Sequence, residues 1–93
     1  MNLQKIKTGY NKAMETNRPP VAVIMENKGW GWLTTRRDEI ISAVIDAGAI
    51  SESAVAALGE EEAGYTIANE AWKYATSYRF DSTNPTKSFI KQW

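Results

Sequence analysis

The sequence predicts a small α+β fold that is mainly α with one β-hairpin, with about four helices around a core rich in Trp and Tyr. Three observations indicate this. Apolar residues recur at three- and four-residue steps along most of the chain, residues 21–34 favour strands, and four Trp and four Tyr supply large apolar surfaces. A length of 93 residues fits one domain, residues 1–93, with a single core. An all-α fold is the alternative.

The first predicted helix covers residues 2–15. Asn2 is placed to accept hydrogen bonds from the free amides of the first turn. Pro19 and Pro20 end the segment, because proline lacks an amide donor and disfavours the helical conformation in its predecessor. The apolar residues that recur at helical spacing are Leu3, Ile6, Tyr10 and Met14.

The β-hairpin is predicted over residues 21–34, where two apolar, β-favouring arms flank an Asn-Lys-Gly turn at 27–29. Its register is open, since a turn of three residues instead of two moves both indoles of the second arm to the other face. The rival interpretation is a short helix that Pro20 starts and Gly29 ends.

Two helices joined by a glycine turn are predicted next. Residues 36–47 carry a stripe of Ile and Val, with Thr35 as the expected cap and Gly48 as the expected end. Ser51 is placed to cap a short helix that Gly59 ends. The pair resembles a helical hairpin.

The longest predicted helix covers residues 61–79, and three glutamates stand at its start, where the helix dipole favours negative charge. Its apolar stripe consists of Ile67, Ala68, Ala71, Trp72, Ala75 and Tyr78. After a polar loop, Pro85 starts a last short turn. This turn is expected to bring three apolar residues onto the body of the fold: Phe89, Ile90 and Trp93.

The composition lacks two of the side chains that catalytic sites use most often. The chain has no Cys and no His, which excludes disulfides, thiolate catalysis, Ser-His-Asp triads and sulfur-ligated zinc. Its densest carboxylates, at 38–39 and 60–62, are adjacent in sequence, and adjacent residues of a helix do not face each other. We therefore expect a protein that is not an enzyme and needs no cofactor or metal ion.

Charge is segregated along the chain although the net charge is zero. Counting Lys and Arg against Asp and Glu, residues 1–37 carry seven positive and two negative charges, residues 38–70 carry eight negative and none positive, and residues 71–93 carry four positive and one negative. Either the acidic middle pairs with the basic ends inside the fold, or it forms a surface that attracts a basic partner. The carboxylates of that surface are Asp38, Asp46, Glu52, Glu60, Glu61 and Glu62.

Trp30 and Trp32 stand near the cations Lys28, Arg36 and Arg37. Aromatic and basic side chains in this mixture either form a protein-binding hot spot or stack single-stranded bases while the cations hold the backbone. The alternative is burial, because a core of this size needs large apolar side chains.

Residues 48–58 resemble the turn and second helix of a helix-turn-helix, with a Gly turn and an Ile-Ser-x-x-x-Val step after an apolar helix. The resemblance covers about twenty residues, and one extra residue separates Gly48 from Ile50. Glu52, Ser53 and Ala56 take the positions where DNA readers carry Arg, Lys, Asn or Gln. The pattern thus favours packing over DNA reading.

The function predicted from these features is that of a non-enzymatic, inhibitor-like accessory module. It docks on a larger macromolecule through the acidic surface, through Trp30 and Trp32, or through both, and a basic groove of a nucleic-acid-handling protein is the natural target. The alternative is a nucleic-acid-binding regulator that uses the basic N-terminal third and the helix-turn-helix-like segment. Self-association as a homo-oligomer is a third possibility. Without an apolar run of membrane-spanning length, we expect a cytoplasmic protein that does not enter a membrane.

Overall fold

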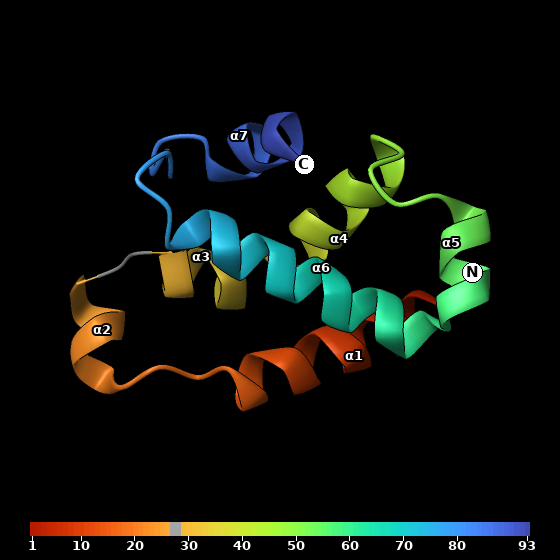
Figure 1. The fold of residues 1–93 in the computed structure, drawn as a ribbon, viewed down its shortest axis with the longest axis horizontal. Coiled ribbons are helices and arrows are strands. Elements are labelled where there is room, and N and C mark those ends of the chain that lie inside the picture. Colours follow the sequence, from red (N-terminus) through yellow and green to blue (C-terminus); the bar gives the residue numbers. More distant parts are fainter. Residues whose placement is uncertain (27–28) are drawn as a thin grey trace.

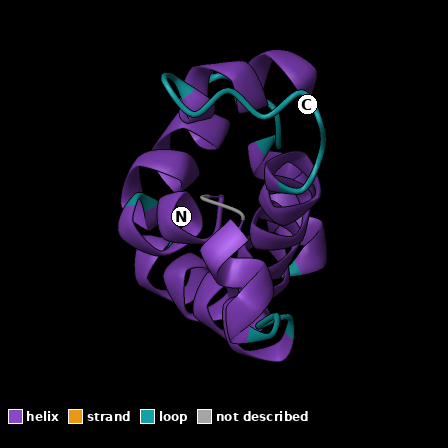
Figure 2. Cartoon of the chain, turned by 90° about the vertical axis from the view of Figure 1, so that its left-hand side faces the viewer, coloured by secondary structure: helices purple, strands orange, loops and turns teal. Residues whose placement is uncertain are grey.

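The computed structural model describes residues 1–26 and 29–93, and this part of the chain contains seven helices and no strand (Figure 1). The all-α alternative is therefore the one that fits. Figure 2, coloured by secondary structure, shows helices linked by loops throughout the described chain. The helices are α1 (Leu3–Thr16), α2 (Val21–Glu26), α3 (Gly29–Thr35), α4 (Arg37–Asp46), α5 (Glu52–Leu58), α6 (Glu60–Ala75) and α7 (Pro85–Gln92).

The β-hairpin predicted over residues 21–34 is wrong, because α2 and α3 occupy this segment. Its predicted turn residues Asn27 and Lys28 lie outside the described residues. The carbonyl of Pro20 accepts the backbone amide of Val23 at 3.0 Å, so proline starts α2 as the rival interpretation proposed. The end that it proposed at Gly29 is wrong, because α2 ends at Glu26 and Gly29 is the first residue of α3. The second helix, α3, was not foreseen.

Burial of α3 explains why β-propensity is overridden here. As a helix, the segment places Trp32 and Leu33 in the core, where they are 6% and 0% exposed. Trp30 packs edge-on against Trp72 of α6, with the ring centroids 5.4 Å apart. A two-stranded hairpin on its own is marginal in water, and the described chain supplies no third strand to extend it. Packing therefore decides the structure of this segment.

The main helix pair is α1 with α6, which lie side by side and point in the same direction (Figure 1). Their backbones touch through two glycines. A Cβ added to Gly9 would lie 1.8 Å from the carbonyl oxygen of Glu61, and one added to Gly64 would lie 1.8 Å from the carbonyl oxygen of Ile6. Each glycine thus faces the carbonyl three residues before the other glycine, and no side chain fits between the two helices.

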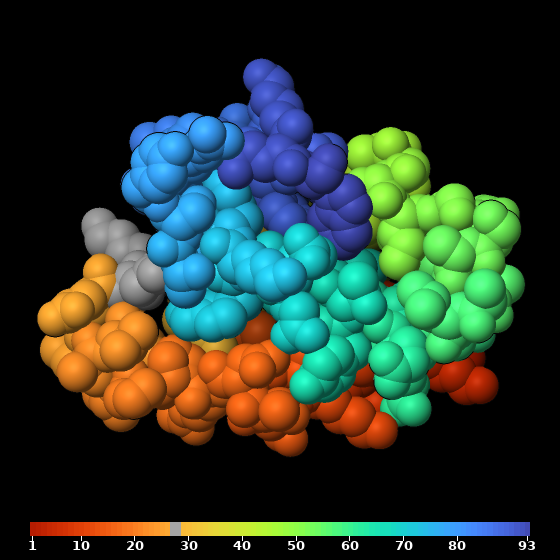
Figure 3. Space-filling model, in the orientation of Figure 1, coloured from red at the N-terminus to blue at the C-terminus, as the bar shows by residue number. Residues whose placement is uncertain are grey.

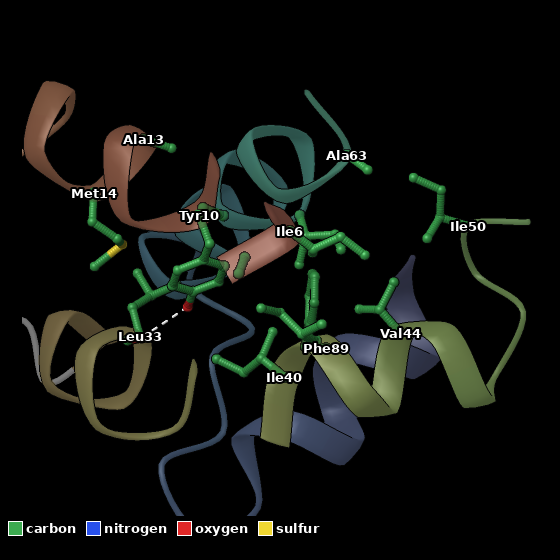
Figure 4. Packing of buried hydrophobic residues seen from close by; sticks show 14 of the residues in the cluster. Ile6, Tyr10, Ala13, Met14, Leu33, Ile40, Val44, Ile50, Ala63 and Phe89 are labelled. Atoms are coloured by element: carbon green, nitrogen blue, oxygen red, sulfur yellow. Dashed lines mark hydrogen bonds between the residues drawn. The ribbon is translucent and has the colours of Figure 1, made fainter. Parts of the chain in front are cut away.

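A continuous apolar core packs against this pair (Figure 4). Tyr10 of α1 is 1% exposed, and its hydroxyl donates a hydrogen bond of 2.8 Å to the carbonyl of Leu33, which links α1 to α3. Burial raises the pKa of the Tyr10 phenol well above its ordinary value. The largest fully buried side chains are Tyr10, Ile6, Leu33, Ile40, Ile41, Ile67 and Val44.

Several predicted helix ends are confirmed. The side chain of Asn2 accepts a backbone amide of the first turn of α1 at 3.0 Å, and the hydroxyl of Ser51 does the same for α5 at 3.1 Å. Gly48 follows α4 with φ of 68°, and two amides there close a Schellman motif on the last turn. The cap predicted at Thr35 is wrong: Thr35 belongs to α3, its hydroxyl donates to the Gly31 carbonyl, and α4 starts without a side-chain cap.

The longest helix, α6, ends at Ala75, short of its predicted end. The hydroxyl of Thr76 donates to the carbonyl of Trp72 at 3.1 Å, and that of Ser77 donates to another carbonyl of the last turn at 2.8 Å. The backbone amide and the hydroxyl of Ser77 both donate to the Tyr74 carbonyl, which a continued helix would pair with the amide of residue 78. Tyr78 therefore leaves the apolar stripe on which it was predicted and is 90% exposed. The last predicted turn is confirmed as α7.

We expect Gly64→Ala to lower the free energy of unfolding by about 2–3 kcal/mol, because the new methyl group forces the backbones of α1 and α6 apart and this outweighs a gain of about 1 kcal/mol in helix propensity. Urea unfolding followed by circular dichroism measures this. Gly31→Ala is the matched control, since a Cβ at Gly31 meets no atom within 4 Å. It should raise stability by about 0.5–1 kcal/mol. Equal effects of the two changes would contradict the close packing.

Tyr10→Phe should lower the free energy of unfolding by about 1–2 kcal/mol near neutral pH, because the buried carbonyl of Leu33 loses its donor. The raised pKa of Tyr10 fixes how this difference depends on pH. Below about pH 10 the phenol is neutral in both states, and above it the unfolded state loses the proton first, so the contribution of Tyr10 declines. Unfolding curves of both proteins from pH 7 to 11 should therefore converge at the alkaline end. A gap that widens would contradict the burial of this hydroxyl.

Candidate functional site

The six carboxylates predicted to share one surface fall into two groups. Three are held by the N-terminal part of the chain, and three are exposed. The first group is Asp38, Glu60 and Glu61. The second group is Asp46, Glu52 and Glu62.

Asp38 sits between two cations at the start of α4. Its carboxylate lies 2.9 Å from the Nε of Arg37 and 3.5 Å from the Nζ of Lys7. The hydrogen bond from the Arg37 side chain, together with the charges of Arg37 and Lys7, holds the pKa of Asp38 below its ordinary value. The carboxylate is thus already matched by basic residues of the same chain.

Glu60 and Glu61 face α1. The carboxylate of Glu60 accepts a hydrogen bond from the backbone amide of Asn2, and the carboxylate of Glu61 lies 2.9 Å from the Nζ of Lys12. Both contacts follow from the parallel packing of α1 and α6, which brings the two N-terminal ends together. For these residues, pairing inside the fold explains the charge pattern.

Asp46, Glu52 and Glu62 are exposed, and none of them forms an ion pair within residues 1–26 and 29–93. They come from the end of α4, the start of α5 and the first turn of α6. In Figure 1, α5 and the first turn of α6 form the right-hand end of the molecule, and the end of α4 lies further toward the middle of the view. The structure therefore leaves half of the predicted acidic set exposed and without an ion pair in the described chain.

A hollow of about 340 Å³ lies at the end formed by α5 and the first turn of α6, and Met1, Val55 and Ala56 form its apolar part. Glu52 and Glu60 line its edge. Met1 is 56% exposed, so the apolar surface is open to solvent. We call this surface the acidic end: the hollow together with the carboxylates Asp46, Glu52 and Glu62.

Trp30 and Trp32 do not form an exposed pair. Trp32 is buried among Tyr74, Phe80 and Phe89, and its indole Nε1 donates to the hydroxyl of Thr86 at 2.9 Å. Trp30 is half-buried against α6. The structure thus places Trp32 in the core and leaves only part of Trp30 at the surface.

The cations of the alternative nucleic-acid site do not form one free basic surface among the described residues. Arg37 uses its Nε on Asp38 and its Nη1 on the side chain of Asn11, at 2.9 and 3.1 Å. Arg36 is exposed, but it lines a hollow shared with the carboxylate of Glu39. Lys28 lies outside the described residues. The helix-turn-helix-like segment corresponds to α4, the Gly48 turn and α5, and α5 has seven residues.

Two further surfaces were not singled out from the sequence. None of the residues of α2 is buried, and its Met25 is 81% exposed, at the end of the molecule opposite α5 (Figure 1). The second surface is a hollow of about 390 Å³ beyond the end of α6, lined in part by Tyr78, Arg79 and Trp93. In the sequence, Thr76 and Ser77 favour a helix end, and Tyr78 and Arg79 follow directly. This pattern could have indicated the hollow.

Within the described residues, no group of three or more Asp or Glu is arranged to hold a metal ion. None of the seven described helices has the length and apolar character needed to cross a membrane. No protein-family model, no curated protein and no solved structure matches the chain. Surface chemistry is therefore the basis for inferring function.

Proposed function

We propose that this protein is a non-enzymatic binding module that docks on a basic surface of a larger protein through its acidic end. The observation that supports this is the arrangement there: Glu52 and Glu60 line an open apolar hollow, and neither carboxylate forms an ion pair in the described chain. Protein interfaces commonly combine an apolar centre with a polar rim. The acidic end has both parts in one place.

The partner's chemistry follows from the charges. Asp38 and Glu61 form ion pairs, and Glu60 is held by a neutral backbone amide. The carboxylates of the predicted set without an ion pair in the described chain are therefore Asp46, Glu52, Glu60 and Glu62. The negative field of these carboxylates speeds encounter with a surface rich in Lys and Arg. A groove that binds nucleic acid is a surface of that kind, and carboxylates seated in it compete with phosphates. This would make the module an inhibitor-like accessory of a nucleic-acid-handling protein.

Reversing Glu52 and Glu62 together to Lys tests the proposal. Both residues are exposed and unpaired in the described chain, so the double variant should fold normally. Capture of the partner from nuclease-treated host extract should fall about tenfold or more, because two attractive charges become repulsive. Nuclease treatment separates direct protein contact from bridging by nucleic acid.

The matched control reverses two carboxylates away from the acidic end, Glu15→Lys with Glu26→Lys, which are exposed in α1 and α2. It makes the same change in net charge and should retain capture. Circular dichroism checks that both double variants stay folded. Equal capture by Glu52→Lys/Glu62→Lys and the wild type, or an equal loss in the control, would remove the acidic end as the docking surface.

A further inference from the structure

The hollow beyond the end of α6 is built from three segments: the last turns of α6, the loop that follows it and the end of α7. These segments, cyan to dark blue in Figure 3, adjoin one another on the face shown. Its floor consists of the buried rings of Tyr74 and Phe89, whose centroids are 5.7 Å apart. The site lies at the opposite end of α6 from the acidic end.

Two aromatic rings line the hollow and remain open to solvent. Tyr78 is 90% exposed and Trp93 is 40% exposed. Trp93 packs on Phe89 with ring centroids 5.3 Å apart, and the guanidinium of Arg79 lies 5.4 Å from the centre of the Tyr78 ring. Exposed aromatic rings can stack on a planar ligand.

The charges divide the hollow into two parts. Lys73 lies 3.3 Å from the carboxylate of Glu70, so that side is close to neutral. Arg79 has no carboxylate partner among the described residues, and its Nε donates to the Tyr78 hydroxyl at 3.1 Å. The exposed Lys91 of α7 adds a further positive charge close along the chain to Trp93. An anionic group is therefore favoured at the Arg79 side.

We propose that this hollow binds single-stranded nucleic acid, with bases stacking on Tyr78 and Trp93 and a phosphate held by Arg79. Proteins that bind single-stranded nucleic acid combine aromatic rings with cations. The rings stack on the bases, and the cations attract the negatively charged phosphates that link the nucleotides. An acidic peptide can form an ion pair with Arg79, but it lacks the planar bases that would stack on Tyr78 and Trp93. The site shares no residue with the acidic end, so it stands independently of the docking proposal.

Fluorescence anisotropy with a labelled twelve-nucleotide oligothymidylate at low salt tests the proposal. Tyr78→Ala should weaken binding about fivefold or more, which corresponds to the lower end of one base–aromatic stack. Tyr78→Phe keeps the ring and loses only the hydrogen bond from Arg79, so it should retain most of the binding that Tyr78→Ala loses. The high exposure of Tyr78 means that neither change disturbs the core. An equal loss in both Tyr78 variants, or no binding by the wild type, would overturn the proposal.

The charge contribution is tested with Arg79→Gln, which should weaken binding severalfold and reduce its salt dependence. Arg18→Gln removes the same charge from an exposed site outside the hollow and should leave binding unchanged. Equal effects of the two changes would contradict a phosphate position at Arg79.

Three competitor ligands identify the chemistry. An abasic oligonucleotide of the same length and poly-glutamate of similar charge should both compete much more weakly than oligothymidylate. Competition as strong as that of oligothymidylate by either one shows that charge alone is recognised, and it would overturn base stacking. Thymidine monophosphate should compete weakly as well, and strong competition would replace the single strand with a free nucleotide as the ligand.

Discussion

The contact of α1 and α6 through Gly9 and Gly64 is the constraint on which the rest of the structure depends. Because the two backbones meet without intervening side chains, the helices are held in one register and point the same way. That register sets Lys12 beside Glu61 and the N-terminal amides beside Glu60. The packing of the two glycines therefore decides that Glu60 and Glu61 are held by the N-terminal part of the chain.

The two proposed surfaces lie at the two ends of α6, a helix of 16 residues. At 1.5 Å per residue this helix is about 24 Å long. The glutamates of the first turn and Lys73 of the last turn also suit the helix dipole, which favours negative charge at the start and positive charge at the end. Between the two ends, α6 is covered by α1 on one side and by the indoles of α3 on another. The two surfaces on which the proposals rest therefore lie toward different ends of α6.

Local signals were enough to predict most helices. Asn2 and Ser51 cap the helices that they were expected to cap, because such hydrogen bonds involve only neighbouring residues. The burial of Trp32 could not be predicted from neighbouring residues, because a short apolar segment is compatible with a strand and with a helix. The packing of Trp32 against α6 and α7 decides between the two. The role of Gly9 and Gly64 was also hidden, since a glycine within a helical pattern indicates only lower helix propensity. The candidate site was predictable to the same degree: the sequence identified the acidic residues, and only the packing shows which of them are paired.

Nuclear Overhauser contacts between the backbones of α1 and α6 test the central claim most directly. The Cβ position of Gly64 lies 2.8 Å from the amide nitrogen of Tyr10, and that of Gly9 lies 2.8 Å from the Cα of Glu61. The account predicts strong cross-peaks from a Gly64 Hα to the Tyr10 amide proton and from a Gly9 Hα to the Glu61 Hα. Helical chemical shifts in both segments without these cross-peaks would contradict it.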